Sequence, residues 1–164
     1  MRNHFLFFAP LLLAVTAQPS RSAAAFQQLA TLAGEWEGIQ DGEPISVTFT
    51  VTANRSALME QDKPVNAPAM VMITMFTVDG DRLIATHYCS ARNQPQMVNT
   101  TIGDLTKDGV TFSLDRVTGM KTPDDWHNTG LTITQQDEDH ITQRWTYRYK
   151  GTAGTTTFHY ARKK

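Results

Sequence analysis

The sequence predicts an all-β protein: an antiparallel up-and-down β-barrel of about eight to ten strands, preceded by a short N-terminal helix. Apolar and polar residues alternate with period two through much of the chain beyond residue 45. Short turns that contain Gly, Asp or Asn separate the alternating runs, and helical spacing occurs only near the start. A sheet of this many strands exposes two edges unless it closes on itself, so the pattern favours a closed barrel.

The start of the chain has the three parts of a secretory signal peptide. Arg2 supplies an early positive charge, the apolar run Phe5–Ala17 follows, and small residues then give candidate cleavage sites after Ala17 and after Ala25. The apolar run is about 13 residues long, whereas a membrane-spanning helix needs about 20. We therefore expect a cleaved leader, no membrane span after cleavage, and a secreted or periplasmic protein.

Composition limits the classes of function. The chain has 164 residues, 15 Lys+Arg, 16 Asp+Glu and one Cys. A boundary after Ala25 gives a leader over residues 1–25 and one barrel domain over residues 26–164, and the net charge changes from −1 to −3 because Arg2 and Arg21 are removed. Such a domain offers no basic field for nucleic acid. A lone cysteine excludes an intrachain disulfide and Cys-rich metal sites.

The first elements of the domain follow from local spacing. Phe26, Leu29 and Leu32 recur about every three residues, which predicts about two turns of helix over Phe26–Ala33. From Ile45 to Thr52 apolar residues alternate with Ser and Thr, which is typical of a strand with one buried face. A turn at Asn54 then predicts a return strand over residues 56–61.

The remaining strands are separated by recognisable turns. Residues 69–78 are apolar on both faces and end at Asp79-Gly80, a dipeptide that favours a tight hairpin because it tolerates positive φ. The partner strand is Arg82–Cys89. Further strands are predicted at Met97–Ile102, Val110–Arg116, Leu131–Gln136, His140–Lys150 and Thr155–Arg162.

A Gly-x-Trp motif, Gly34-Glu-Trp36, stands between the predicted helix and the first strand. It resembles the opening motif of the lipocalin-like (calycin) barrels. In that family the Trp closes the base of the barrel and packs on an Arg or Lys from a late strand. The late-strand candidates here are Arg144, Arg148 and Arg162, and we take Gly34, Trp36 and Arg162 as the barrel-closure residues. A guanidinium can stack on an indole while its charge still reaches water.

A second motif follows the predicted Asp-Gly hairpin. Residues 86–95 read Thr-His-Tyr-Cys-Ser-Ala-Arg-Asn-Gln-Pro. This segment is similar to one found in small secreted bacterial proteins of uncharacterised function with lipocalin-like barrels. The resemblance implies a β-barrel and the binding of a small molecule, and it supplies no catalytic residues.

His87 and Cys89 lie on one face of their predicted strand, because residues two apart point the same way. They could share a metal ion, or the imidazole could activate the thiol as a nucleophile. The simpler interpretation is a buried Cys beside a hydrogen-bonded His. Since a metal site needs three or four ligands and the other histidines show no ligand spacing, we predict no metal, no cofactor and no catalytic residue.

The ligand-binding hypothesis rests on aromatic residues at inward positions of the late strands. We expect Trp145 and Tyr147 to supply an apolar lining, and we expect polar contacts near one barrel mouth from His87, Tyr88, Asn93 and Gln94. The partner is then a small apolar or amphipathic ligand, held without catalysis. Two alternatives stay open: a small isomerase or hydrolase that uses His87 in the same cavity, and a structural or interaction module whose barrel is filled by side chains. Neither the ligand's identity nor the oligomeric state follows from the sequence.

Overall fold

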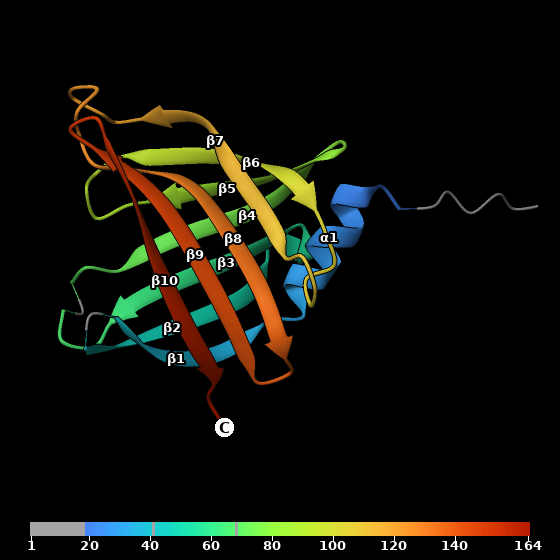
Figure 1. Ribbon diagram of the computed structural model, residues 1–164. Helices are drawn as coiled ribbons and strands as arrows, with labels where there is room; N and C mark the ends of the chain where they lie inside the picture. The colour runs from blue at the N-terminus through green and yellow to red at the C-terminus, as the bar shows by residue number, and fades with distance from the viewer. Residues whose placement is uncertain (1–18, 41, 68) are drawn as a thin grey trace, which may run out of the picture.

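Ten antiparallel strands close into a barrel in the computed structural model, which describes residues 19–40, 42–67 and 69–164 (Figure 1). Each strand pairs with its neighbours in the sequence, and the first strand closes the barrel against the last. This confirms the predicted all-β, up-and-down barrel with a short N-terminal helix. The apolar run Phe5–Ala17 lies outside the described residues. Within the described part, no helix is both long and apolar enough to cross a membrane.

The elements follow one another with short connections. In chain order they are α1 (Arg21–Ala30), β1 (Gly34–Gln40), β2 (Glu43–Thr52), the 3₁₀ turn η1 (Ala53–Arg55), β3 (Ala57–Pro64), β4 (Met72–Asp79), β5 (Arg82–Tyr88), β6 (Gln94–Ile102), β7 (Val110–Thr118), β8 (His127–Asp137), β9 (His140–Tyr149) and β10 (Thr152–Arg162). The predicted hairpin between β4 and β5 is present, and Gly80 has a φ of +61° in its turn. Strand β3 continues to Pro64, beyond the predicted end at Gln61.

Helix α1 begins at Arg21, earlier than its apolar spacing indicates. The Ser20 hydroxyl caps it by accepting a hydrogen bond from the Ala23 N–H at 3.2 Å, and the alanines that follow have high helix propensity. Ala25, Phe26 and Leu29 are buried. The hydroxyl of buried Ser22 donates to the Gly80 carbonyl at 2.8 Å. Residues before Phe26 are therefore part of the packed structure.

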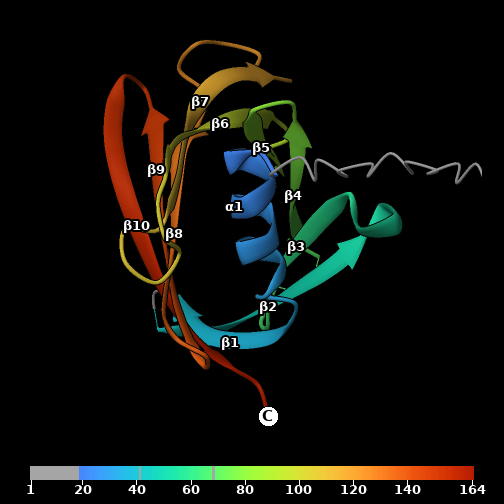
Figure 2. The ribbon, with the colours of Figure 1, turned by 90° about the vertical axis from the view of Figure 1, so that its right-hand side faces the viewer.

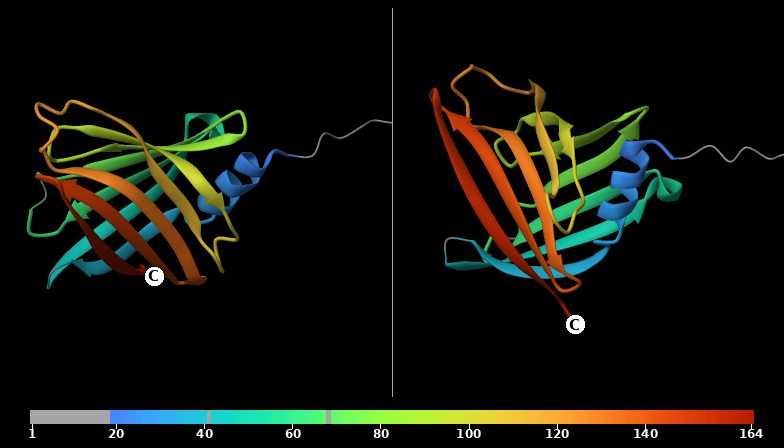
Figure 3. Two further views of the ribbon diagram at one scale, coloured as in Figure 1. Left: turned by 45° about the horizontal axis from the view of Figure 1, so that its top comes forward. Right: turned by 45° about the vertical axis from the view of Figure 1, so that its right-hand side comes forward.

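The helix lies across one end of the barrel (Figures 2 and 3). The view along the barrel in Figure 2 places α1 within the ring of strands. Close to α1 the interior is filled by large apolar side chains, which include Leu58, Phe76, Leu83, Phe112 and Ile133. The loops β1–β2, β3–β4, β5–β6, β7–β8 and β9–β10 lie at the opposite end, which we call the open end.

The residues expected to close the barrel meet at the α1 end. The Arg162 guanidinium lies 4.2 Å from the centre of the Trp36 ring and donates to the carbonyls of Ala33 at 3.1 Å and Glu138 at 3.0 Å. The Trp36 indole N–H donates to the Leu32 carbonyl at 2.8 Å. At Gly34 a Cβ would lie 2.8 Å from the Arg162 guanidinium, so a side chain there would displace the arginine.

Candidate functional site

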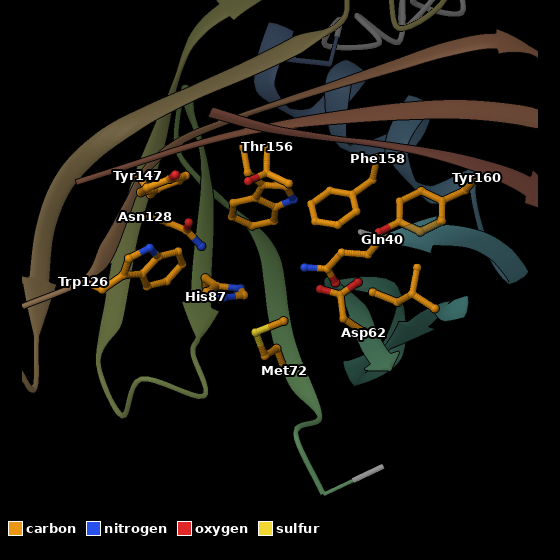
Figure 4. A pocket seen from close by; sticks show the side chains of 12 residues that line it. Gln40, Asp62, Met72, His87, Trp126, Asn128, Tyr147, Thr156, Phe158 and Tyr160 are labelled. Atoms are coloured by element: carbon orange, nitrogen blue, oxygen red, sulfur yellow. The ribbon is translucent and has the colours of Figure 1, made fainter. Parts of the chain in front are cut away.

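A cavity of about 100 Å³ lies inside the barrel toward the open end (Figure 4). Strands β1 to β5 form one side of it, and β8 to β10 with the loop before β8 form the other. Its walls are lined by Gln40, Ile45, Asp62, Met72, His87, Trp126, Asn128, Trp145, Tyr147, Thr156, Phe158 and Tyr160. The lining is mostly apolar, with a few polar groups at defined positions, as is typical of small-molecule sites.

Aromatic rings form most of the wall on the β8–β10 side. The rings of Trp126 and Tyr147 lie 5.5 Å apart, centre to centre, at 30°. Tyr147 faces Gly154 across the β9–β10 pair, and a Cβ at Gly154 would overlap the phenol ring. Glycine at this position therefore makes room for the Tyr147 ring. Phe158 and Tyr160 continue the wall toward the α1 end, with their ring centres 6.0 Å apart.

Two buried acids stand on the inner face of β3. Glu60 is 0% exposed and Asp62 is 5% exposed, and they follow Leu58 at alternate positions. Burial raises the pKa of Asp62 from 3.8 to about 7. Burial, together with repulsion from Asp62, raises the pKa of Glu60 well above its ordinary value. A carboxyl group taken out of water favours its neutral form, so the pair holds protons at pH values where exposed acids are ionised.

A hydrogen-bond chain crosses the barrel from β9 to Glu60. The Trp145 indole N–H donates to the Gln143 side-chain oxygen at 3.0 Å, and the Gln143 amide donates to Glu60 Oε1 at 2.7 Å. All three side chains are buried. The chain fixes the orientation of the Trp145 ring. Along β3, Glu60 stands between Leu58 of the apolar core and Asp62 of the cavity wall. Glu60 Oε2 has no partner among the described residues.

His87 occupies the wall beside these groups. Its Nδ1 lies 3.0 Å from Thr74 Oγ1, and its ring centre lies 4.9 Å from that of Trp145. The row Glu60–Thr74–His87 runs across β3, β4 and β5 at paired positions. Burial lowers the pKa of His87 to about 4, so the imidazole is neutral at pH 7. Its Nε2 and Asp62 Oδ1 are buried without hydrogen-bond partners among the described residues.

Three of the six residues predicted to bind the ligand line this cavity: His87, Trp145 and Tyr147. Tyr88 is 50% exposed, because it alternates with His87 and faces outward from β5. Asn93 lies in the β5–β6 connection, and its amide donates to the Trp126 carbonyl at 2.6 Å. Gln94 accepts a hydrogen bond from Thr118 at 3.0 Å. Asn93 therefore holds a cavity residue in place, whereas Gln94 joins β6 to β7 outside the cavity.

Cys89 lies beyond the end of β5 and is not among the cavity-lining residues. Its sulfur accepts the Ala91 N–H at 3.4 Å, and burial raises the pKa of the thiol. A raised pKa disfavours the nucleophilic thiolate. In the part of the chain that the structure describes, no three His, Cys, Asp or Glu residues converge on a metal position.

The two buried acids were not among the predicted site residues. Their signal in the sequence is weak but readable: Leu58, Glu60 and Asp62 share one face of a strand whose partner strand β2 buries Ile45, Val47 and Phe49. Acids at inward positions of an apolar face indicate a buried polar site. Gln143 was missed for a related reason, because its partner Glu60 stands 83 residues away.

Fold and site together define a class: a closed ten-stranded antiparallel barrel with a helix across one end and an aromatic, acid-containing cavity toward the other. A search against protein-family models and a search of curated proteins each found no match. The function must therefore be inferred from the cavity itself.

Proposed function

We propose that the protein is an exported, non-catalytic carrier with a lipocalin-like barrel, which holds a small amphipathic molecule in the cavity at the open end. One observation carries the proposal: an aromatic-lined cavity contains two buried polar atoms, Asp62 Oδ1 and His87 Nε2, that have no partner among the described residues. Leaving such an atom unsatisfied costs about 1–3 kcal/mol. Buried polar groups are normally paired, so a ligand that supplies hydrogen bonds there is favoured.

The cavity volume sets the size of the bound group. A dry cavity of about 150 Å³ accepts benzene, which has six heavy atoms. By the same proportion, about 100 Å³ accepts about four heavy atoms. A longer ligand extends from the cavity toward the loops of the open end. The same volume argues against a barrel that is completely filled by its own side chains.

The geometry favours binding over catalysis. The lone thiol, Cys89, lies outside the cavity, and among the described residues that line the cavity no nucleophile is hydrogen-bonded to a base. The enzyme alternative has one observation in its favour: Asp62 and His87 have pKa values of about 7 and about 4 in one cavity, and titratable groups shifted apart are common in acid–base catalysis. Turnover of a bound compound, abolished by His87→Ala, would establish that alternative.

Two features support the lipocalin-like and exported parts of the proposal. The stacking of Arg162 on Trp36 at the helix-covered end is the arrangement that the resemblance implies. The predicted leader supports export. Because Ser22 and Ala25 pack against the barrel as part of α1, we place leader cleavage after Ala17, which leaves the helix whole.

Native mass spectrometry of the protein isolated from its own periplasm or culture medium tests the carrier hypothesis. We expect a stoichiometric small-molecule adduct that is released on unfolding. Thr156 lines the cavity, so Thr156→Phe adds a ring that fills most of it and removes the adduct. The matched control is Thr157→Phe, one residue along β10 on the exposed face, which leaves the adduct in place.

The result that would overturn the proposal is equally direct. If the native protein carries no adduct, and small apolar and amphipathic probes fail to perturb the indole signals of the refolded protein, the cavity is not a binding site.

A further inference from the structure

We infer that the ligand of this cavity carries a protonated primary amine, with the Asp62 carboxylate as its counter-ion and the neighbouring aromatic rings and His87 around it. The inference rests on the proposed function, because it names the chemical class of the molecule that the carrier holds. Three properties of the cavity lead to it: its charge, its unpartnered acceptor atoms and its π surfaces.

The ionisable groups buried inside the barrel include two acids and, among the described residues, no Lys or Arg that could act as their counter-ion. The two acids are Glu60 and Asp62. The titratable groups that face Asp62 are Glu60, on its own strand, His87 from β5 and Tyr160 from β10. None of these supplies a positive charge at pH 7. A carboxylate in such a place is stable only with a counter-ion or as the neutral acid, so the cavity favours a cationic ligand and disfavours an anionic one.

The unpartnered atoms match an ammonium group. Asp62 Oδ1 is an acceptor in the cavity wall without a partner among the described residues. When the neutral imidazole donates from Nδ1 to Thr74 Oγ1, His87 Nε2 becomes a second acceptor. A primary ammonium has three N–H donors and no acceptor. Asp62 from β3 and His87 from β5 both line the cavity and project into it (Figure 4), so their acceptor atoms face the space that a bound ammonium would occupy.

The aromatic wall attracts a cationic ligand more strongly than a neutral alcohol of the same shape. Trp126, Trp145, Tyr147, Phe158 and Tyr160 line the cavity. The face of an aromatic ring is negative, so it attracts a cation held within about 6 Å of the ring centre. Rings also shield the ion pair from water, which strengthens it. A quaternary ammonium would gain the ring contacts but has no N–H for the acceptors. The site therefore distinguishes a primary amine from both an alcohol and a quaternary ammonium.

The pH dependence of binding follows from Asp62. Its carboxyl group has a pKa of about 7 in the ligand-free protein, and the ammonium binds the ionised form. Below pH 7 each bound amine must release the Asp62 proton, so affinity should fall about tenfold for each pH unit on the acid side. Above pH 7 the affinity should level off. The affinity for a neutral ligand should not fall in this way below pH 7, and its binding should release no proton.

Four probes of about five heavy atoms test these statements on the mature protein, freed of its native ligand. They are n-butylamine, 1-butanol, propionate and tetramethylammonium. Binding is followed by the indole N–H signals in a nitrogen–proton correlation spectrum, since the Trp145 N–H lies in the hydrogen-bond chain at the cavity. At pH 8 we expect n-butylamine to bind at least tenfold more tightly than each of the other three. At pH 6 an unbuffered titration should release about one proton per bound amine.

Asp62→Asn keeps the size of the side chain and removes its charge. This variant should lose the preference for n-butylamine and still bind 1-butanol. The matched control is Asp115→Asn on the exposed face of β7, which should retain the wild-type preference. Because proton release is measured on the unmodified protein, the test does not depend on the folding of a variant.

The outcomes separate the two hypotheses. Equal affinities for n-butylamine and 1-butanol, tightest binding of propionate or of tetramethylammonium, or amine binding without proton release would overturn the amine inference and leave the carrier function standing. If none of the probes binds and the native protein carries no adduct, both fail.

Discussion

Replacing Asp62 by Asn should make the ligand-free protein more stable at neutral pH, although the residue lies in the proposed site. The side chain is 5% exposed, and burial raises its pKa from 3.8 to about 7. The folded protein thus keeps the Asp62 proton up to about pH 7, whereas the unfolded chain releases it near pH 3.8. Between these values the folded state holds the additional proton, so stability decreases as pH rises and is constant above pH 7.

The magnitude follows from the same two pKa values. A pKa that differs by one between the folded and unfolded protein corresponds to about 1.4 kcal/mol, which gives about 4 kcal/mol of stability lost between pH 4 and pH 7. His87 acts in the opposite direction, because burial lowers its pKa from 6.5 to about 4. Its contribution to the free energy of unfolding rises between pH 4 and pH 6.5, as the imidazole of the unfolded chain loses its proton. The two effects oppose each other in the unmodified protein. The His87 contribution is common to both proteins and cancels in the difference between Asp62→Asn and wild type, which reports Asp62 together with its repulsion of Glu60.

Urea unfolding followed by tryptophan fluorescence measures this difference. With a urea m-value of about 2 kcal/mol per molar for a domain of this size, Asp62→Asn should raise the unfolding midpoint by about 2 M at pH 8 and by little at pH 4. Asp115→Asn, at an exposed position, should leave the midpoint nearly unchanged at both pH values. If the urea midpoints of wild type and Asp62→Asn differ by the same amount from pH 4 to pH 8, Asp62 is not a buried acid with a raised pKa.

Three further predictions concern other parts of the barrel. Arg162→Met should lower the free energy of unfolding by about 2 kcal/mol, because the stack on Trp36 and the hydrogen bonds to three carbonyls are lost. Unchanged urea unfolding would show that the stack adds nothing. Gly154→Ala should push the Tyr147 ring from the cavity wall and cost about 1–3 kcal/mol; probe binding and tyrosine side-chain signals like those of the wild type would contradict this. The mature protein should begin after Ala17, which a measurement of its intact mass can test. A mass that corresponds to cleavage after Ala25 would show that the N-terminal half of α1 is dispensable.

The buried chain from Trp145 through Gln143 to Glu60 explains why the barrel has both a solid core and a cavity. Between α1 and the chain, apolar side chains fill the interior. The three hydrogen-bonded side chains are held in fixed positions, so they do not collapse into the cavity on their other side. Hydrogen bonds between buried side chains are stronger than in water, so they hold these groups in one arrangement. The cavity is thus a consequence of this hydrogen-bond chain as much as of the number of strands.

Much of the fold was readable from local pattern. The period-two run of β2 and the Asp79-Gly80 turn are dictated by neighbours in the chain, because a strand alternates faces and a tight turn needs positive φ. The start of α1 was missed because its first turns are built on Ala and a Ser cap rather than on apolar spacing. Tyr88 was assigned to the ligand together with His87, yet adjacent strand residues point to opposite faces, and the structure places Tyr88 outside.

By itself, the sequence determined the fold class, the number of strands to within about two, and three residues of the cavity wall, His87, Trp145 and Tyr147. The alternation of Glu60 and Asp62 with Leu58 is only a weak sign of burial, since alternation assigns side chains to two faces without saying which polar residues stay on the inner one. The burial of the two acids depends on closure of the barrel, which places β3 opposite β9 and brings Gln143 to Glu60 across 83 residues of chain. The physical reason is that the pKa of an acid and its need for a partner depend on the dielectric environment, which only the closed barrel creates.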